Sequence, residues 1–267
     1  MVGASVVKVA ESIWNYSLDK WGLEFSDESR ENLVRADKLL EKNSLVFYIN
    51  HTNNKKGPRF SRFADIILPA AMVLAHLPNA KQRIAPVAES HYSLRRDPVN
   101  ALGLRLIGVV GAIDLLPVVQ PSRLDAKASE YKQSDRESKT RRVTDEMKRI
   151  VAEPGAVFGI APEATRTDGS LKQGARGLGL LSRFDPEERL RYSDLAIAMG
   201  EFHDEQPRVV FGEPLALSEV LVKMNVKGEL IKESNDRFQF ITDVHMRRLA
   251  QDLPRSMRGY YGEEEND

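Results

Sequence analysis

A histidine and an aspartate stand at the two ends of a polar loop in this sequence. His51 ends the segment SLVFYINH and Asp65 opens the segment DIILPAAM, with residues 52–64 between them. An imidazole beside a carboxylate can act as a general base, because the carboxylate holds the ring tautomer and stabilises the imidazolium that forms. The two residues are therefore candidates for a pair that takes a proton from a hydroxyl group. The alternative is a structural histidine at one end of an ordinary surface loop.

A second polar cluster follows another apolar segment, AVFGI at 156–160. It contains Glu163, Arg166 and Lys172, and it leads into the apolar segment GLGLL. An arginine can grip a phosphate through two parallel N–H donors, a lysine adds positive charge, and backbone N–H groups at a helix start can bind an anion. The cluster is a candidate anion-binding site. The alternative is a surface ion pair between Glu163 and Arg166, which would contribute little to stability.

Both clusters follow short apolar runs that are typical of buried β-strands. The runs lie at residues 44–51, 83–89, 108–119, 156–160, 194–200 and 208–215, and a helix is expected at 65–77. Their alternation with helical patterns predicts an α/β fold: a single domain with a central, mostly parallel sheet flanked by helices, plus N- and C-terminal helical segments. In such sheets ligands bind at the carboxyl ends of the strands, where both clusters are expected.

Three regions are expected along the chain: an N-terminal amphipathic helical segment at 1–35, the α/β domain at 36–215, and a C-terminal helical extension with an acidic tail at 216–267. In the first region, apolar residues recur at helical spacing between residues 4 and 22. The simpler interpretation is a helix packed on the main domain. The alternative is a helix lying on a membrane, with Trp14 and Trp21 at the level of the headgroups.

Composition excludes several classes of protein. Lys plus Arg and Asp plus Glu both number 39, so no net charge favours nucleic acid as a partner. The chain has no cysteine, and its 5 histidines show no metal-ligand spacing, so neither thiol chemistry, a metal nor a cofactor is expected. No apolar run reaches the roughly 18 to 20 residues that span a bilayer. A cytoplasmic protein is expected, with peripheral attachment to the membrane face as the alternative.

Several short blocks resemble those of the glycerolipid acyltransferases, which include the glycerol-3-phosphate and 1-acylglycerol-3-phosphate acyltransferases. VFYINH and DIILPAAM are similar to the two halves of the family's first block, in which Asn-His ends a strand and Asp opens a helix. PEATRTDGSLKQGARGLGLL resembles the Pro-Glu-Gly-Thr-Arg block, VVFGEPL the Gly-Glu-Pro element, and DLPRSMRGYYG the closing Arg-Gly-Tyr segment. The blocks stand in family order from about residue 40 to 261, so the resemblance covers most of the chain.

The resemblance implies a phospholipid/glycerol acyltransferase domain that moves a fatty acyl group from a thioester to a lipid hydroxyl. The donor would be acyl-CoA or acyl carrier protein, and the acceptor would be glycerol 3-phosphate or a lysophospholipid. His51 and Asp65 would be the general-base pair. The substrate-binding residues would be Glu163, Thr165, Arg166 and Lys172. Because Glu163 shares the sign of a phosphate, it is expected to orient Arg166 or to accept from a substrate hydroxyl.

The sequence departs from the family pattern at several places. The family has four residues between the histidine and the aspartate, where this chain has residues 52–64; enlarging the loop costs about 1 kcal/mol of closure entropy. The family glycine after the glutamate is Ala164 here, and the segment LAIAMG lacks the family proline. The arginine of the family's second block is missing, and Arg123 is a poor substitute. His91 and Asp97 form a competing pair, without the preceding Asn or the following apolar helix.

The inserted loop interleaves basic residues with two phenylalanines. Its basic residues are Lys55, Lys56, Arg59 and Arg62. We expect them to contact anionic headgroups, coenzyme A phosphates or acidic acyl carrier protein, with the aromatic rings dipping into the lipid interface. The alternative is a solvated loop without a partner.

Two other functions are consistent with the same residues. A catalytically degenerate, lipid-binding member of the fold would explain the long loop and the missing arginine. A thioester or ester hydrolase would use His51 to activate water instead of a lipid hydroxyl.

Overall fold

The structure is a computed structural model. It describes residues 4–21, 25–50, 75–88, 113–118, 141, 142, 145–147, 149, 152–164, 167, 169–181, 192–199, 209–224 and 236–262.

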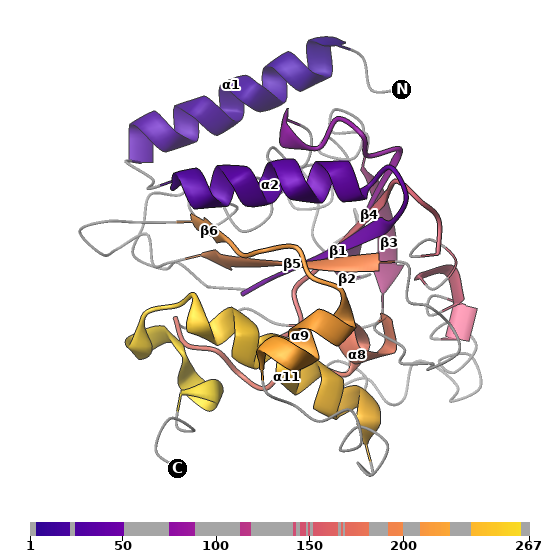
Figure 1. The fold of residues 1–267 in the computed structure, drawn as a ribbon, viewed down its shortest axis with the longest axis vertical. Helices are drawn as coiled ribbons and strands as arrows, with labels where there is room; N and C mark the ends of the chain where they lie inside the picture. Colours follow the sequence, from indigo (N-terminus) through magenta and orange to yellow (C-terminus); the bar gives the residue numbers. More distant parts are fainter. Residues whose placement is uncertain are drawn as a thin grey trace, which may run out of the picture.

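A six-stranded sheet forms the centre of the molecule, with the strand order β3-β2-β4-β1-β5-β6 (Figure 1). Its strands are β1 (Ser44–Ile49), β2 (Gln82–Ala88), β3 (Asp114–Val118), β4 (Ala156–Ile160), β5 (Tyr192–Met199) and β6 (Val209–Phe211). Every neighbouring pair is parallel except β5 with β6, which is antiparallel. Each of the six runs in which the sequence predicts a strand overlaps one, and the predicted α/β class with a largely parallel sheet is confirmed.

β1 lies inside the sheet between β4 and β5, and its two faces are both covered. Leu45 and Ile49 pack into one hydrophobic cluster, whereas Val46 and Tyr48 pack into another on the opposite side. Side chains alternate between the faces of a strand, so a strand that is buried on both faces must be apolar along its whole length. This requirement explains the continuous apolar and aromatic run LVFYI at residues 45–49.

Two helices, α1 (Ala4–Trp21) and α2 (Asp27–Leu39), lie over one face of the sheet (Figure 1). Ser26 caps α2, because its side chain accepts a hydrogen bond from the backbone N–H of Ser29 at 3.1 Å. Asn32 of α2 donates to the carbonyl of Phe211 at 2.8 Å, and the N–H of Phe211 donates to the hydroxyl of Ser29. These bonds satisfy backbone groups of the short edge strand β6, which would otherwise be open for pairing.

Trp14 fixes α1 to the body of the protein. Its side chain is only 2% exposed and packs edge-on against Phe25 and His76, with ring centroids 5.2 and 5.6 Å away. The packing of the N-terminal helix on the main domain is therefore confirmed on this face. The alternative, in which Trp14 lies at lipid headgroups, is wrong because the core encloses the indole.

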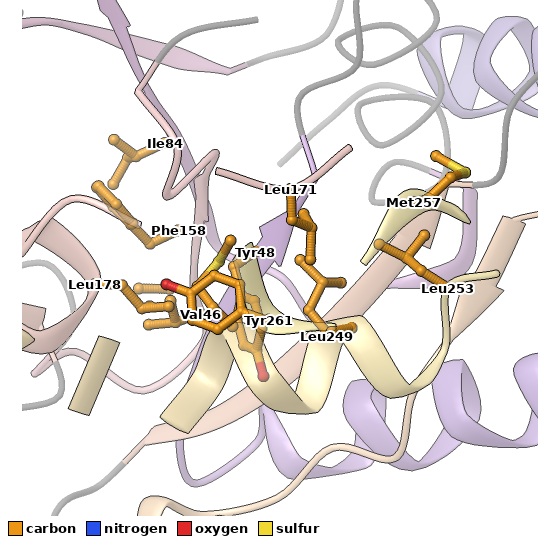
Figure 2. Packing of buried hydrophobic residues seen from close by; sticks show 13 residues of the cluster. Val46, Tyr48, Ile84, Phe158, Leu171, Leu178, Leu249, Leu253, Met257 and Tyr261 are labelled. Atoms are coloured by element: carbon orange, nitrogen blue, oxygen red, sulfur yellow. The ribbon is translucent and has the colours of Figure 1, made fainter. Parts of the chain in front are cut away.

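The opposite face of the sheet is covered by α8 (Gly177–Leu181), α11 (Arg237–Gln251) and two single-turn helices, η2 (Arg255–Met257) and η3 (Gly259–Tyr261). A further helix, α9 (Leu217–Lys223), packs against α11 in a cluster of Val220, Ile241 and Val244, which Leu215, just before α9, joins. Figure 2 shows the cluster under α11, which contains Val46 and Tyr48 of β1 together with Leu249, Met257 and Tyr261. The C-terminal segment thus belongs to the main hydrophobic core.

Most of the helix expected at 65–77 lies outside the described residues. Within that range the structure describes residues 75–77, of which 75 and 76 are helical. Among the helices that the structure describes, none is long and apolar enough to cross a membrane.

Candidate functional site

The two strands that precede the polar clusters in the sequence end side by side. β1 pairs with β4 in parallel, with Tyr48 opposite Ile160, so the two strands end at the same edge. β1 continues into Asn50, which is buried, and β4 continues into Ala161 and Pro162. The observed register between the two strands ends at Tyr48 and Ile160, two residues before Asn50 and Pro162 in the sequence. The first residue after Asn50 is His51, and the first after Pro162 is Glu163.

Glu163 is 5% exposed, and its carboxylate is turned into its own loop. Oε1 accepts a hydrogen bond from the backbone N–H of Lys172 at 2.8 Å. The N–H of Ala175 donates to the carbonyl of Pro162 at 2.7 Å, and that of Ala164 donates to the carbonyl of Ala161 at 3.0 Å. The segment from 162 to 175 is therefore a closed loop whose two ends are bonded to each other at the carboxyl end of β4.

Ala164 adopts a left-handed backbone conformation, with φ at 54°. Among the non-glycine residues that the structure describes, it is alone in having a positive φ. This conformation costs an alanine roughly 1–2 kcal/mol, whereas glycine adopts it freely. Ala164 is also the position at which the acyltransferase block has its glycine. The observed backbone is thus one in which glycine would fit without strain.

The far end of the loop is held by α11 and by the C-terminal segment. The N–H of Gly174 donates to the hydroxyl of Tyr261 at 2.9 Å, and the amide nitrogen of Gln239 donates to the carbonyl of Gly174 at 2.8 Å. Arg176 forms an ion pair with Asp236 at 2.7 Å, which directs its guanidinium toward the start of α11. Sequence reasoning did not single out Tyr261 or Gln239 as residues that support the loop. The spacing of Gln239 and Asp243, one helical turn apart, was the available signal for a shared polar face on α11.

The structure describes two of the residues predicted to bind substrate, Glu163 and Lys172, and brings them together through the bond from the Lys172 backbone. The Lys172 side chain is exposed. Six predicted residues in the first cluster and its loop lie outside the described residues: His51, Asp65, Lys55, Lys56, Arg59 and Arg62. The same holds for Thr165 and Arg166 of the second cluster, and for the competing pair His91 and Asp97 together with Arg123.

A buried polar group lies under β1 on the α11 side. His245 is fully buried and packs edge-on against Tyr48, with ring centroids 5.3 Å apart. Desolvation, followed by the positive charge of Arg248, lowers the pKa of His245 to about 3. Arg248 donates to the backbone carbonyl of Glu213 and to the hydroxyl of Tyr48. These contacts tie the Gly-Glu-Pro segment to β1 and α11, and they give His245 a structural role as a neutral ring.

No group of histidine, aspartate and glutamate side chains that could hold a metal ion occurs within the described residues. No protein-family model matches this sequence, and no curated protein matches it either. The likeness to the glycerolipid acyltransferases therefore rests on the short sequence blocks and on their order along the chain.

Proposed function

We propose that this protein is an O-acyltransferase, which moves a fatty acyl group from acyl-CoA or acyl carrier protein to a hydroxyl of glycerol 3-phosphate or a lysophospholipid. The pairing of β1 with β4 carries the proposal. Through it, β1, which His51 follows in the sequence after Asn50, and β4, which Glu163 follows after Pro162, end at one edge of the sheet. A general base and an anion-binding loop that start from neighbouring strand ends suit a substrate with a hydroxyl close to a phosphate.

In the proposed reaction, His51 takes the proton of the acceptor hydroxyl while the oxygen attacks the thioester carbonyl carbon. A carbon–oxygen bond forms, the carbon–sulfur bond breaks, and the proton on His51 passes to the departing thiolate. Asp65 holds the imidazole tautomer and stabilises the imidazolium. General-base assistance of this kind contributes roughly 10² to 10⁴ in rate. The substrate supplies the nucleophile, so the reaction proceeds without a covalent acyl-enzyme.

In the anion-binding loop, Arg166 would hold the phosphate, with Thr165 as a hydroxyl donor and the exposed Lys172 as a second cation. The bond from the Lys172 N–H to the Glu163 carboxylate supports a role for Glu163 in shaping the loop that presents Arg166. The acyltransferase region would be one α/β domain at residues 36–215. It would work in the cytoplasm or on the membrane face, where Lys55, Lys56, Arg59 and Arg62 would contact an anionic surface.

The test is an assay with radiolabelled acyl-CoA and either lysophosphatidic acid or glycerol 3-phosphate, in which ester product and free fatty acid are separated. Wild type should form ester, and His51→Ala and Asp65→Asn should lower kcat by about 10² or more. His91→Ala is the matched control and should keep wild-type activity. Acyl transfer that survives His51→Ala overturns the mechanism. If the label appears only in free fatty acid, the protein is a hydrolase and not a transferase.

A further inference from the structure

The last described residues of the chain are bonded to the loop that follows β4. The N–H of Leu171 donates to the carbonyl of Met257 at 2.9 Å, and the N–H of Tyr260 donates to the carbonyl of Leu171 at 3.0 Å. Both backbone groups of Leu171 are thus satisfied by the C-terminal segment. Leu171 itself is buried in the cluster that Figure 2 shows, together with Met257 and Tyr261.

Gly259 allows this close approach. Its φ is 48°, and a Cβ atom at this position would overlap the backbone of Leu171. Two independent restrictions therefore require glycine here: the left-handed conformation and the lack of space. The segment can reach the loop in this way only with a residue that has no side chain.

The hydroxyl of Tyr261 has two partners, Gly174 and Asp243, and Gln239 links these two to each other. It accepts from the N–H of Gly174 at 2.9 Å and donates to Oδ1 of Asp243 at 2.7 Å. The Gln239 amide nitrogen donates both to the carbonyl of Gly174, at 2.8 Å, and to the same Asp243 oxygen, at 2.9 Å. Burial raises the pKa of the Tyr261 hydroxyl well above its usual value, so the group keeps the proton that it donates to Asp243.

The network and the carboxylate of Glu163 hold neighbouring residues of the same loop. Glu163 fixes the N–H of Lys172, and the network fixes both backbone groups of Gly174. Residues 165 and 166 lie between the start of this loop and its anchored part at 171–174. Residues 171–174 thus anchor the loop in which Arg166 stands in the sequence.

We propose that Tyr261 is a positioning residue, whose hydroxyl holds Gly174 and thereby the loop that presents Arg166 to the phosphate of the acceptor. This role rests on the proposed acyltransferase function. It assigns to the C-terminal segment a task in acceptor binding, separate from the chemistry of His51. Loss of the Tyr261 hydroxyl should weaken acceptor binding and leave the transfer step nearly unchanged.

Tyr261→Phe is the test variant, and Tyr260→Phe is its matched control. Each change removes one hydroxyl and keeps the edge-on contact between the two rings, whose centroids lie 5.0 Å apart. The Tyr260 side chain is 60% exposed, whereas that of Tyr261 is buried. Initial rates are measured against lysophosphatidic acid at saturating acyl-CoA. For Tyr261→Phe, the KM for lysophosphatidic acid should rise about tenfold with kcat within about threefold of wild type, and Tyr260→Phe should match wild type.

Hydrogen exchange followed by mass spectrometry supplies a readout that does not depend on activity. In Tyr261→Phe, the amides of residues 171–175 should exchange faster than in wild type and in Tyr260→Phe. Unchanged exchange in this segment overturns the proposal. Faster exchange with an unchanged KM also overturns it, because the network would then be structural only. If Tyr261→Phe does not fold, Gln239→Leu removes the other contact to Gly174 and should show the same rise in KM.

The two proposals fail in different ways. Wild-type protein that forms no ester from either acceptor overturns the acyltransferase function and, with it, the kinetic role of Tyr261. Active wild-type protein whose kinetics Tyr261→Phe leaves unchanged overturns the positioning role alone.

Discussion

The carboxylate of Glu163 lies 2.8 Å from the backbone nitrogen of Lys172, from which it accepts a hydrogen bond inside the loop that follows β4. Sequence reasoning paired Glu163 with Arg166 or with a substrate hydroxyl. The described contact shows that one carboxylate oxygen accepts a hydrogen bond from the backbone. Glu163 is 5% exposed, so this bond is shielded from competing water.

Glu163→Ala should therefore destabilise the protein, because it leaves the Lys172 N–H without this acceptor. The expected loss is about 1–3 kcal/mol in the free energy of unfolding, measured by urea denaturation. Glu163→Gln is the matched control, because its side-chain carbonyl can still accept the bond, and it should lose less. Equal stability of wild type and Glu163→Ala would show that the contact contributes nothing.

Ala164→Gly should stabilise the protein, against the usual effect of an alanine-to-glycine change. The substitution relieves the left-handed strain at φ 54°, worth roughly 1–2 kcal/mol, and adds roughly 0.5–1 kcal/mol of backbone entropy to the unfolded chain. The net gain is about 0.5–1 kcal/mol in urea denaturation. Ala36→Gly, inside α2, is the control and should lose about 1 kcal/mol. A loss of stability in Ala164→Gly would contradict the assigned strain.

His245→Gln should remove one step from the pH dependence of stability. The unfolded chain takes up a proton at this residue near pH 6.5, whereas the folded protein keeps the ring neutral down to about 3. Between about pH 3 and pH 6.5, unfolding therefore takes up a proton at His245. The contribution of the neutral ring to the free energy of unfolding is complete above pH 6.5 and is lost as the pH falls through this range. Between pH 6 and 4, the slope of unfolding free energy against pH should be smaller in the variant by about 1.4 kcal/mol per pH unit. Equal slopes in the two proteins would contradict the burial of a neutral His245.

The strands could be predicted because each carries its signal locally. LVFYI is apolar or aromatic at every position since both faces of β1 are covered, and the run ends where Asn50 begins the next segment. The order of the strands has no such signal. Nothing in the residues near Leu45 or Val157 indicates that they lie opposite each other, because this pairing depends on crossovers from distant parts of the chain.

In the candidate site, too, the local features could be predicted from the sequence and the long-range contacts could not. Glu163 and Lys172 could be assigned to one polar loop after a strand because they lie close together in sequence. The bond between Gly174 and the Tyr261 hydroxyl joins residues 87 positions apart, and neither residue type has a pattern that predicts the contact. Ala164 shows the intermediate case: the sequence marked it as a departure from the family glycine, but only the backbone shows the strain that results.

The basic loop between His51 and Asp65 should bind anionic surfaces if it has the expected role. Replacing Lys55, Lys56, Arg59 and Arg62 together by glutamine should weaken binding to vesicles that contain phosphatidic acid, and binding should depend less on salt. Each cation near an anionic surface contributes about 1 kcal/mol, so the effect should be large at low ionic strength. The measurement is vesicle cosedimentation over a range of salt concentrations. Unchanged affinity at low salt would refute the role.

Gly259→Ala should release the C-terminal segment from the loop after β4. The added Cβ would overlap the backbone of Leu171, and the residue would have to keep a φ of 48°, which an alanine adopts at a cost of roughly 1–2 kcal/mol. Because a backbone cannot move aside as a flexible side chain can, η3 must shift and carry Tyr261 with it. We expect a loss of about 2 kcal/mol or more in urea denaturation, together with faster hydrogen exchange at residues 171–175. Gly177→Ala is the control, since its Cβ would meet only Ile160 at an ordinary 3.5 Å, and it should change stability by less than about 0.5 kcal/mol. Wild-type exchange in Gly259→Ala would mean that the loop keeps its position without the C-terminal segment, and the chain of contacts from Gly259 through Tyr261 to Gly174 would then have no part in holding it.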